Sequence, residues 1–209
     1  MAQLPAPFQV ILQTLRDWWD EWFNMLVVGL VWLLCWLTVL LGPPATLGLY
    51  HVTHALAHGE SLGVSGLIAG GRRYFLKGWL WALINLAASM LLFANLLFYG
   101  QIDAVWGGLL QGLFLGLSVL WLVVQFYTLP YLMEQEQQQL RLALRNGLLT
   151  VFASPGYTLV VVGVAALITG LSLLLVMPLF LGVPGLVALL GSRAVLERIE
   201  TFGVHEREE

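Results

Sequence analysis

Charged residues are scarce in this chain of 209 residues. They make up 10% of it, against about 25% in a typical soluble domain, while hydrophobic residues make up 59%. A soluble core cannot absorb that much apolar sequence, so we predict that a lipid bilayer surrounds much of the chain. The few charges gather between apolar blocks, which is typical of membrane-protein loops, and no basic stretch indicates a nucleic-acid partner.

Cysteine is nearly absent, and the common motifs of soluble enzymes are missing. Cys35 is the only cysteine, which excludes an intrachain disulfide and a metal site built from several cysteines. The sequence contains no phosphate-binding loop with its lysine and no Gly-x-Ser-x-Gly nucleophile motif. From these motifs we predict neither a catalytic residue nor a cofactor.

Long apolar runs are what the chain has in abundance. Apolar residues at spacings of three and four over residues 7–23, with polar residues opposite, predict an amphipathic helix in the membrane interface. The later runs predict an all-α integral membrane protein with about five transmembrane helices, in a single membrane domain. The predicted spans cover about residues 24–41, 79–99, 107–131, 157–176 and 179–196, and a charged tail follows at 197–209.

The connection between the first two spans allows two interpretations. Residues 45–58 are too few for an ordinary span, which needs about 20 residues, so we predict a second interfacial or half-inserted helix. The alternative is a sixth span. The glycines in residues 63–71 predict a flexible continuation, and the leucines and arginines of residues 140–149 predict a further surface helix.

Basic residues set the predicted orientation in the membrane. With five spans, eight of the nine Lys and Arg residues fall on one side, and Arg16 is the exception. We therefore predict an outside N terminus and a cytoplasmic C terminus in a bacterial cell membrane, whereas a sixth span would put the N terminus inside. Amphipathic cytoplasmic segments carry basic residues that would contact anionic lipid or a partner protein, namely Arg72, Arg73, Lys77, Arg141 and Arg145.

Three histidines occur at helical spacing in the 45–58 segment. His51, His54 and His58 follow an i, i+3, i+7 pattern, which places them on one face of a helix. Three imidazoles can hold Zn²⁺ or another transition metal, although one helix rarely supplies three converging ligands without a further group from elsewhere. The alternatives are interfacial histidines that replace basic residues, or a pH sensor.

Small and polar residues alternate along the third predicted span. Gly108, Gly112 and Gly116 form a small-xxx-small ridge of the kind that lets helix backbones approach closely in lipid. We predict that this helix is the most closely packed one of the bundle. Polar residues on the second and third spans predict either interhelical hydrogen bonds or a path for a solute, and they are Asn85, Ser89, Gln111, Ser118 and Gln125.

Short motifs along nearly the whole chain resemble those of one known family. The motifs lie at residues 33–36, 41–53, 58–60, 73–78 and 144–150, and Pro155 follows them. They are similar in sequence and order to motifs of the YesL-like family of bacterial multi-pass membrane proteins, a domain of unknown function. His54 and His58 stand where such proteins often carry Arg or Lys, and Gly147 replaces the usual Ala. The resemblance implies association with carbohydrate ABC importers, and it supplies no catalytic residue.

Ionisable residues are missing from the middle of every predicted span. Ion-coupled carriers and proton pumps normally keep such a residue, so neither is expected. Three hypotheses stay open: a partner subunit that binds ABC permease subunits, an autonomous small-solute transporter or channel, and a metal-dependent membrane enzyme that uses the histidines. The resemblance and the lack of an energy-coupling residue favour the first.

Overall fold

The structure is a computed structural model that describes residues 5–175 and 177–208, with side chains except at 174–181 and 203–208. The described residues form helices and contain no strand, so the predicted all-α class is confirmed. The final residues of the predicted span 157–176 and of the predicted tail 197–209 lie outside the described part. The helices are α1 (Ala6–Asp20), α2 (Trp22–Leu37), α3 (Gly42–Ala57), α4 (Gly63–Arg73), α5 (Phe75–Gly100), α6 (Val105–Glu134), α7 (Leu140–Ala153), α8 (Pro155–Leu175) and α9 (Met177–Glu208).

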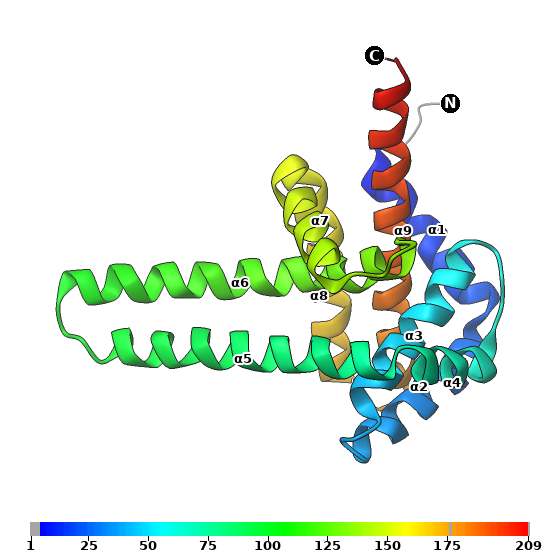
Figure 1. Ribbon diagram of the computed structural model, residues 1–209, viewed down its shortest axis with the longest axis horizontal. Helices are drawn as coiled ribbons and strands as arrows, with labels where there is room; N and C mark the ends of the chain where they lie inside the picture. Colours follow the sequence, from blue (N-terminus) through cyan, green and yellow to red (C-terminus); the bar gives the residue numbers. More distant parts are fainter. Residues whose placement is uncertain (1–4, 176, 209) are drawn as a thin grey trace.

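Helices α5 and α6 form a long antiparallel hairpin that projects from the rest of the protein (Figure 1). At 1.5 Å per residue they are about 39 Å and 45 Å long, so each exceeds the bilayer core of about 30 Å. No residue of the most apolar 18-residue stretch of α5 is buried within the protein, and only 6% of that of α6 is. Both helices, and residues Pro155–Leu173 of α8, are long and apolar enough to cross a membrane.

The outer part of the hairpin exposes large apolar side chains on both helices. Phe93 and Phe98 of α5 and Leu109 and Leu122 of α6 are each more than 60% exposed. An apolar surface this extensive is not stable in water and marks contact with lipid or with another apolar partner. The prediction that α6 is the most closely packed helix is therefore wrong for its outer part, because within the described chain only α5 packs against it there.

One hydrophobic core surrounds the C-terminal part of α6, at the base of the hairpin. Tyr127 and Leu132 of α6 are fully buried there, against Val161 of α8 and Val195 of α9. Helices α1, α3 and α7 also contribute residues, so at least five other helices take part in the core around this end of α6. Helix α6 is thus largely exposed in its N-terminal part and buried in its C-terminal part.

A second core joins α2, α3, α4 and α9. Met25 and Val28 of α2, Val52 of α3 and Leu189 of α9 have no exposed surface. Helix α3 is buried over most of its length, so the 45–58 segment lies inside the protein rather than on its surface. The glycine-rich stretch after it forms the regular helix α4, and its glycines allow this helix to pack closely on α3.

The two N-terminal helices meet at a sharp bend. The axes of α1 and α2 differ by 87° across a break at Glu21, close to the predicted boundary between the interfacial helix and the first span. Helix α1 buries Val10 and Thr14 against the rest of the protein, whereas Leu12 and Trp19 are largely exposed. The apolar face predicted for residues 7–23 is therefore mostly not covered by the chain itself.

Helix α9 is the element around which most of the protein packs. It contacts α1, α2, α3, α6 and α8, and it runs across the direction of the α5–α6 hairpin (Figure 1). The predicted span 179–196 lies within α9. The five predicted spans consequently do not form one parallel bundle.

Candidate functional site

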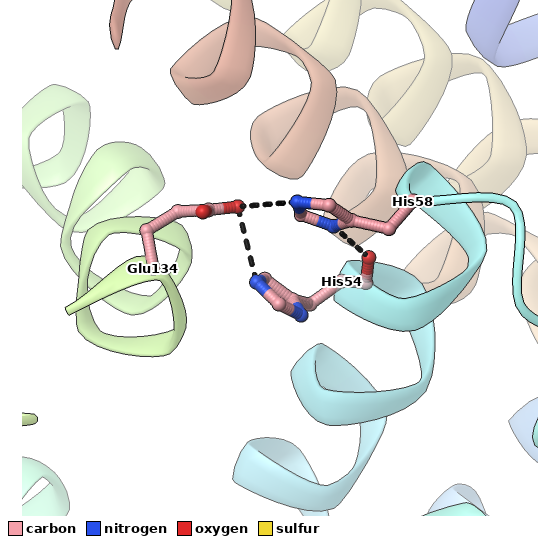
Figure 2. A group of neighbouring side chains, drawn as sticks. All are labelled: His54, His58 and Glu134. Atoms are coloured by element: carbon pink, nitrogen blue, oxygen red, sulfur yellow. Dashed lines mark hydrogen bonds and ion pairs between the residues drawn. The ribbon is translucent and has the colours of Figure 1, made fainter. Parts of the chain in front are cut away.

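Two histidines and a glutamate converge where α3 and α6 end. The Nε2 atom of His54 lies 3.1 Å from Oε1 of Glu134, and Nε2 of His58 lies 3.9 Å from the same oxygen. One ligand atom from each residue lies within 4.8 Å of the other two. Figure 2 shows both imidazoles, carried by α3, facing the carboxylate at the end of α6.

The local sequence explains why the histidines stand together at the end of α3. His54 and His58 are four residues apart, so they lie on the same helix face one turn from each other, with ring centroids 4.4 Å apart. Gly59 adopts a positive φ of 84°, and its N–H bonds to Leu56 O while the N–H of Glu60 bonds to Ala55 O. These two bonds form a Schellman motif, which ends α3 at His58.

Glu134 is the residue that sequence reasoning missed. It is the last residue of α6, and tertiary contact between α3 and α6 brings it to the histidines from 76 positions beyond His58. Its Oε1 atom is buried, and among the described residues it makes no hydrogen bond beyond its contacts with the two imidazoles. The only signal for it in the sequence was its position. Glu134 is the first ionisable residue after the third apolar run, on the same predicted side of the membrane as the 45–58 segment.

His51, the third histidine of the predicted set, does not join the cluster. Its ring packs edge-on against Tyr74, with centroids 6.0 Å apart, and lies close to Gly70 of α4. Burial, followed by the charges of His54 and Arg73, lowers the pKa of His51. The structure therefore brings Glu134, and not His51, together with His54 and His58, because the α3–α4 contact occupies the His51 side chain.

The polar residues of the second and third spans divide into two groups. Gln125 Oε1 accepts hydrogen bonds from Trp81 Nε1 at 3.0 Å and from Asn85 Nδ2 at 3.1 Å, which joins α5 to α6. Ser118 donates to the carbonyl of its own helix, and Ser89 and Gln111 are exposed. Only Asn85 and Gln125 are brought together, so the five predicted residues do not line one path.

The glycine ridge of α6 faces open space. A Cβ added at Gly108, Gly112 or Gly116 would meet no atom of the described structure within 4 Å. By contrast, a Cβ at Gly147 of α7 would lie 3.2 Å from the carbonyl of Val124 in α6, in a contact between two packed helices. The predicted ridge exists, but no helix of the described chain packs on it.

The predicted basic residues lie around the base of the hairpin. Arg73 and Lys77 flank the ring of Tyr74, with the cationic groups 5.4 Å and 5.8 Å from its centroid. Lys77 donates to Gln138 Oε1, and Gln138 Nε2 donates to the Tyr74 hydroxyl, which links the start of α5 to the segment after α6. The remaining three are exposed, and they are Arg72, Arg141 and Arg145.

Comparisons with known proteins return no relative. No protein-family model matches the chain, and neither a curated protein nor a solved structure does. The class that the fold defines is an all-α protein with at least three helices able to cross a membrane. The resemblance to the YesL-like family stays a prediction from sequence motifs.

Proposed function

We propose that this protein is a multi-pass protein of a bacterial cell membrane that acts as a partner subunit of a carbohydrate ABC importer. In this proposal it binds the permease subunits through the α5–α6 hairpin. The observation that carries the proposal is the open ridge of Gly108, Gly112 and Gly116 on α6. The identity of the partner rests on the motifs that resemble the YesL-like family.

A ridge of small residues favours association between helices in lipid. Leucine gains little by leaving lipid for another helix, so association depends on close van der Waals contact and on polar bonds between helices. Glycines at every fourth position leave a shallow groove in which a second backbone can approach closely. Within the described chain α5 packs on a different face of α6. Asn85 of α5 bonds to Gln125 of α6, whereas no atom lies within 4 Å of a Cβ placed at the ridge glycines.

The proposed topology places the base of the hairpin in the cytoplasm and its tip outside. The basic residues Arg72, Arg73 and Lys77 lie at the base, whereas the tip carries a single charge, Asp103. The five predicted spans then give an outside N terminus and a cytoplasmic C terminus, with α9 and the hairpin at different tilts. Reporters fused at each terminus and inserted at the tip test this arrangement, and a cytoplasmic signal from the tip would contradict it.

The distribution of polar groups is why we do not propose an autonomous transporter. Asn85 and Gln125 are engaged with each other, and Ser118 with its own helix, so no continuous polar lining runs between α5 and α6 in the described structure. Residues 79–99, 107–131 and 157–173 also contain no ionisable Asp, Glu, Lys or Arg that could couple transport to an ion gradient.

Co-purification tests the partner role. The tagged protein is extracted from its native membrane in a mild detergent, and the proteins that accompany it are identified by mass spectrometry. We expect permease subunits in stoichiometric amounts. Recovery of this protein alone, with carbohydrate uptake unchanged after deletion of its gene, would overturn the proposal.

A pair of matched variants tests the docking surface. Gly112→Leu fills the ridge of α6, whereas Gly163→Leu makes the same change at an open position of α8. A Cβ at either position meets no atom of the described structure within 4 Å, so both variants are expected to fold, which size-exclusion chromatography checks. We expect Gly112→Leu to lose the permease and Gly163→Leu to keep it. Equal recovery with both variants would show that the ridge is not the contact surface.

A further inference from the structure

We propose that His54, His58 and Glu134 form a binding site for a divalent transition metal, with Zn²⁺ as the best match. Two imidazole nitrogens and one carboxylate oxygen are ligands that zinc commonly takes, and a His₂Glu set leaves a fourth position for water. The site does not depend on the proposed partner role, because it is argued only from the geometry at the ends of α3 and α6.

The two distances from Glu134 to the imidazoles are close to those around a tetrahedral ion, and the three ligand atoms lie within 4.8 Å of one another. With metal–ligand bonds of about 2.0–2.2 Å, two ligands of a tetrahedral site lie about 3.3–3.6 Å apart. The Nε2 atoms of His54 and His58 lie 3.1 Å and 3.9 Å from Glu134 Oε1, on either side of that value. Movements of a few tenths of an ångström would therefore bring both pairs to the ideal spacing.

A hydrogen bond outside the ligand set orients one of the imidazoles. His58 Nδ1 lies 2.9 Å from the backbone carbonyl of His54, and a carbonyl oxygen can only accept, so Nδ1 carries the proton. In the neutral imidazole the lone pair is then on Nε2, which faces Glu134. Metal-binding histidines generally have such a second partner, which fixes both the tautomer and the ring orientation.

Burial and helix ends both favour a cation at this position. Among the described residues, the buried Oε1 atom of Glu134 has no hydrogen-bond partner beyond its contacts with the two imidazole nitrogens, and a buried carboxylate needs a cationic partner. His58 is the C-cap of α3 and Glu134 is the last residue of α6, so the negative ends of two helix dipoles meet at the cluster. Protonated imidazoles would also place positive charge beside Glu134 and the two helix ends. The experiment below distinguishes this alternative from a bound metal.

The site is reachable from solvent on one side. The side chain of His58 is 42% exposed and lines a polar cavity of about 290 Å³ together with Glu197 and Glu200 of α9. His54 and Glu134 do not line this cavity, so His58 is the ligand through which the site meets solvent there. Bound metal would tie the end of α3 to the end of α6, and so hold the base of the hairpin to the rest of the protein.

The test measures metal binding directly on the full chain. The protein is purified with a tag that contains no histidine, treated with a chelator, and titrated with Zn²⁺ by calorimetry and with Co²⁺ by visible absorption. We expect one ion per chain, a Co²⁺ spectrum of low coordination number, and a Tm raised by about 5–10 °C at a Zn²⁺ excess of 100 times Kd.

Single substitutions separate this site from adventitious binding. We expect His54→Gln, His58→Gln and Glu134→Gln each to weaken Zn²⁺ binding at least tenfold. The matched control is His51→Gln, which changes a histidine of the same helix outside the cluster and is expected to bind Zn²⁺ as the wild type does. Absence of a stoichiometric ion, or undiminished binding in Glu134→Gln, would overturn the proposal and leave an imidazole–carboxylate ion pair.

Discussion

Gly48 lies where α3 and α4 approach each other closely. A Cβ at this position would lie 2.3 Å from the carbonyl oxygen of Leu67 and 3.1 Å from the amide nitrogen of Gly71. Both atoms belong to the backbone of α4, which cannot rotate aside as a side chain can. Since ordinary contact begins at 3.4 Å, Gly48→Ala would require α4 to move by about 1 Å.

The expected loss of stability follows from two opposing terms. Overpacking a well-packed contact destabilises a protein by about 1–3 kcal/mol. Replacing a helical glycine with alanine stabilises the helix by about 0.5–1 kcal/mol. The difference between these two ranges is a loss of up to about 2.5 kcal/mol for Gly48→Ala, which in a chain of this size lowers Tm by up to about 10 °C.

Thermal unfolding in mild detergent measures this effect. Tryptophan fluorescence is recorded at one heating rate for the wild type, for Gly48→Ala and for the control Gly108→Ala. The control keeps the helix-propensity gain but adds its methyl group in open space, so its Tm is expected to be unchanged or slightly raised. If Gly48→Ala were as stable as Gly108→Ala, the close contact between α3 and α4 would not exist as described.

Two further substitutions test buried polar contacts with the same assay. Gln125→Leu removes the oxygen that accepts a hydrogen bond from Asn85, and we expect it to destabilise the protein by about 1 kcal/mol. The control Ser118→Ala removes only a hydrogen bond within one helix and should leave Tm unchanged. Equal Tm values for the two variants would contradict the interhelical role of Gln125. Tyr131→Phe removes the buried 2.6 Å hydrogen bond with Thr150 and should lower Tm by about 2–4 °C. A Tm at the wild-type value would show that this hydrogen bond does not contribute to stability.

Local patterns in the sequence determined which segments are helical. Long apolar runs broken by Gly, Pro and polar turns predicted helices at 79–99, 107–131 and 157–176, and α5, α6 and α8 cover these ranges, apart from residue 176, which the structure does not describe. Such predictions depend only on residues a few positions apart, because helical hydrogen bonds are local. The same locality explains why His54 and His58 could be placed on one helix face from spacing alone.

Contacts between distant segments were decided only by the tertiary structure. Glu134 reaches the histidines because α3 and α6 pack together, and His51 leaves them because α4 packs on its side of α3. Periodicity identifies the faces of a helix, but it does not say which face meets which neighbour. For the same reason the ridge at Gly108, Gly112 and Gly116 was visible in the sequence, whereas its lack of a partner in the described chain was not.

The sequence by itself determined an all-α chain too apolar for water, with its few charges gathered between the apolar runs. The tertiary structure decided that α9 crosses the hairpin, that the 45–58 segment is buried, and that a carboxylate faces two imidazoles. The physical reason is that composition fixes the solvent a chain requires, since burial free energy scales with apolar area whatever its arrangement. The positions of ligands and docking surfaces depend instead on how whole helices pack, which is a property of the complete fold.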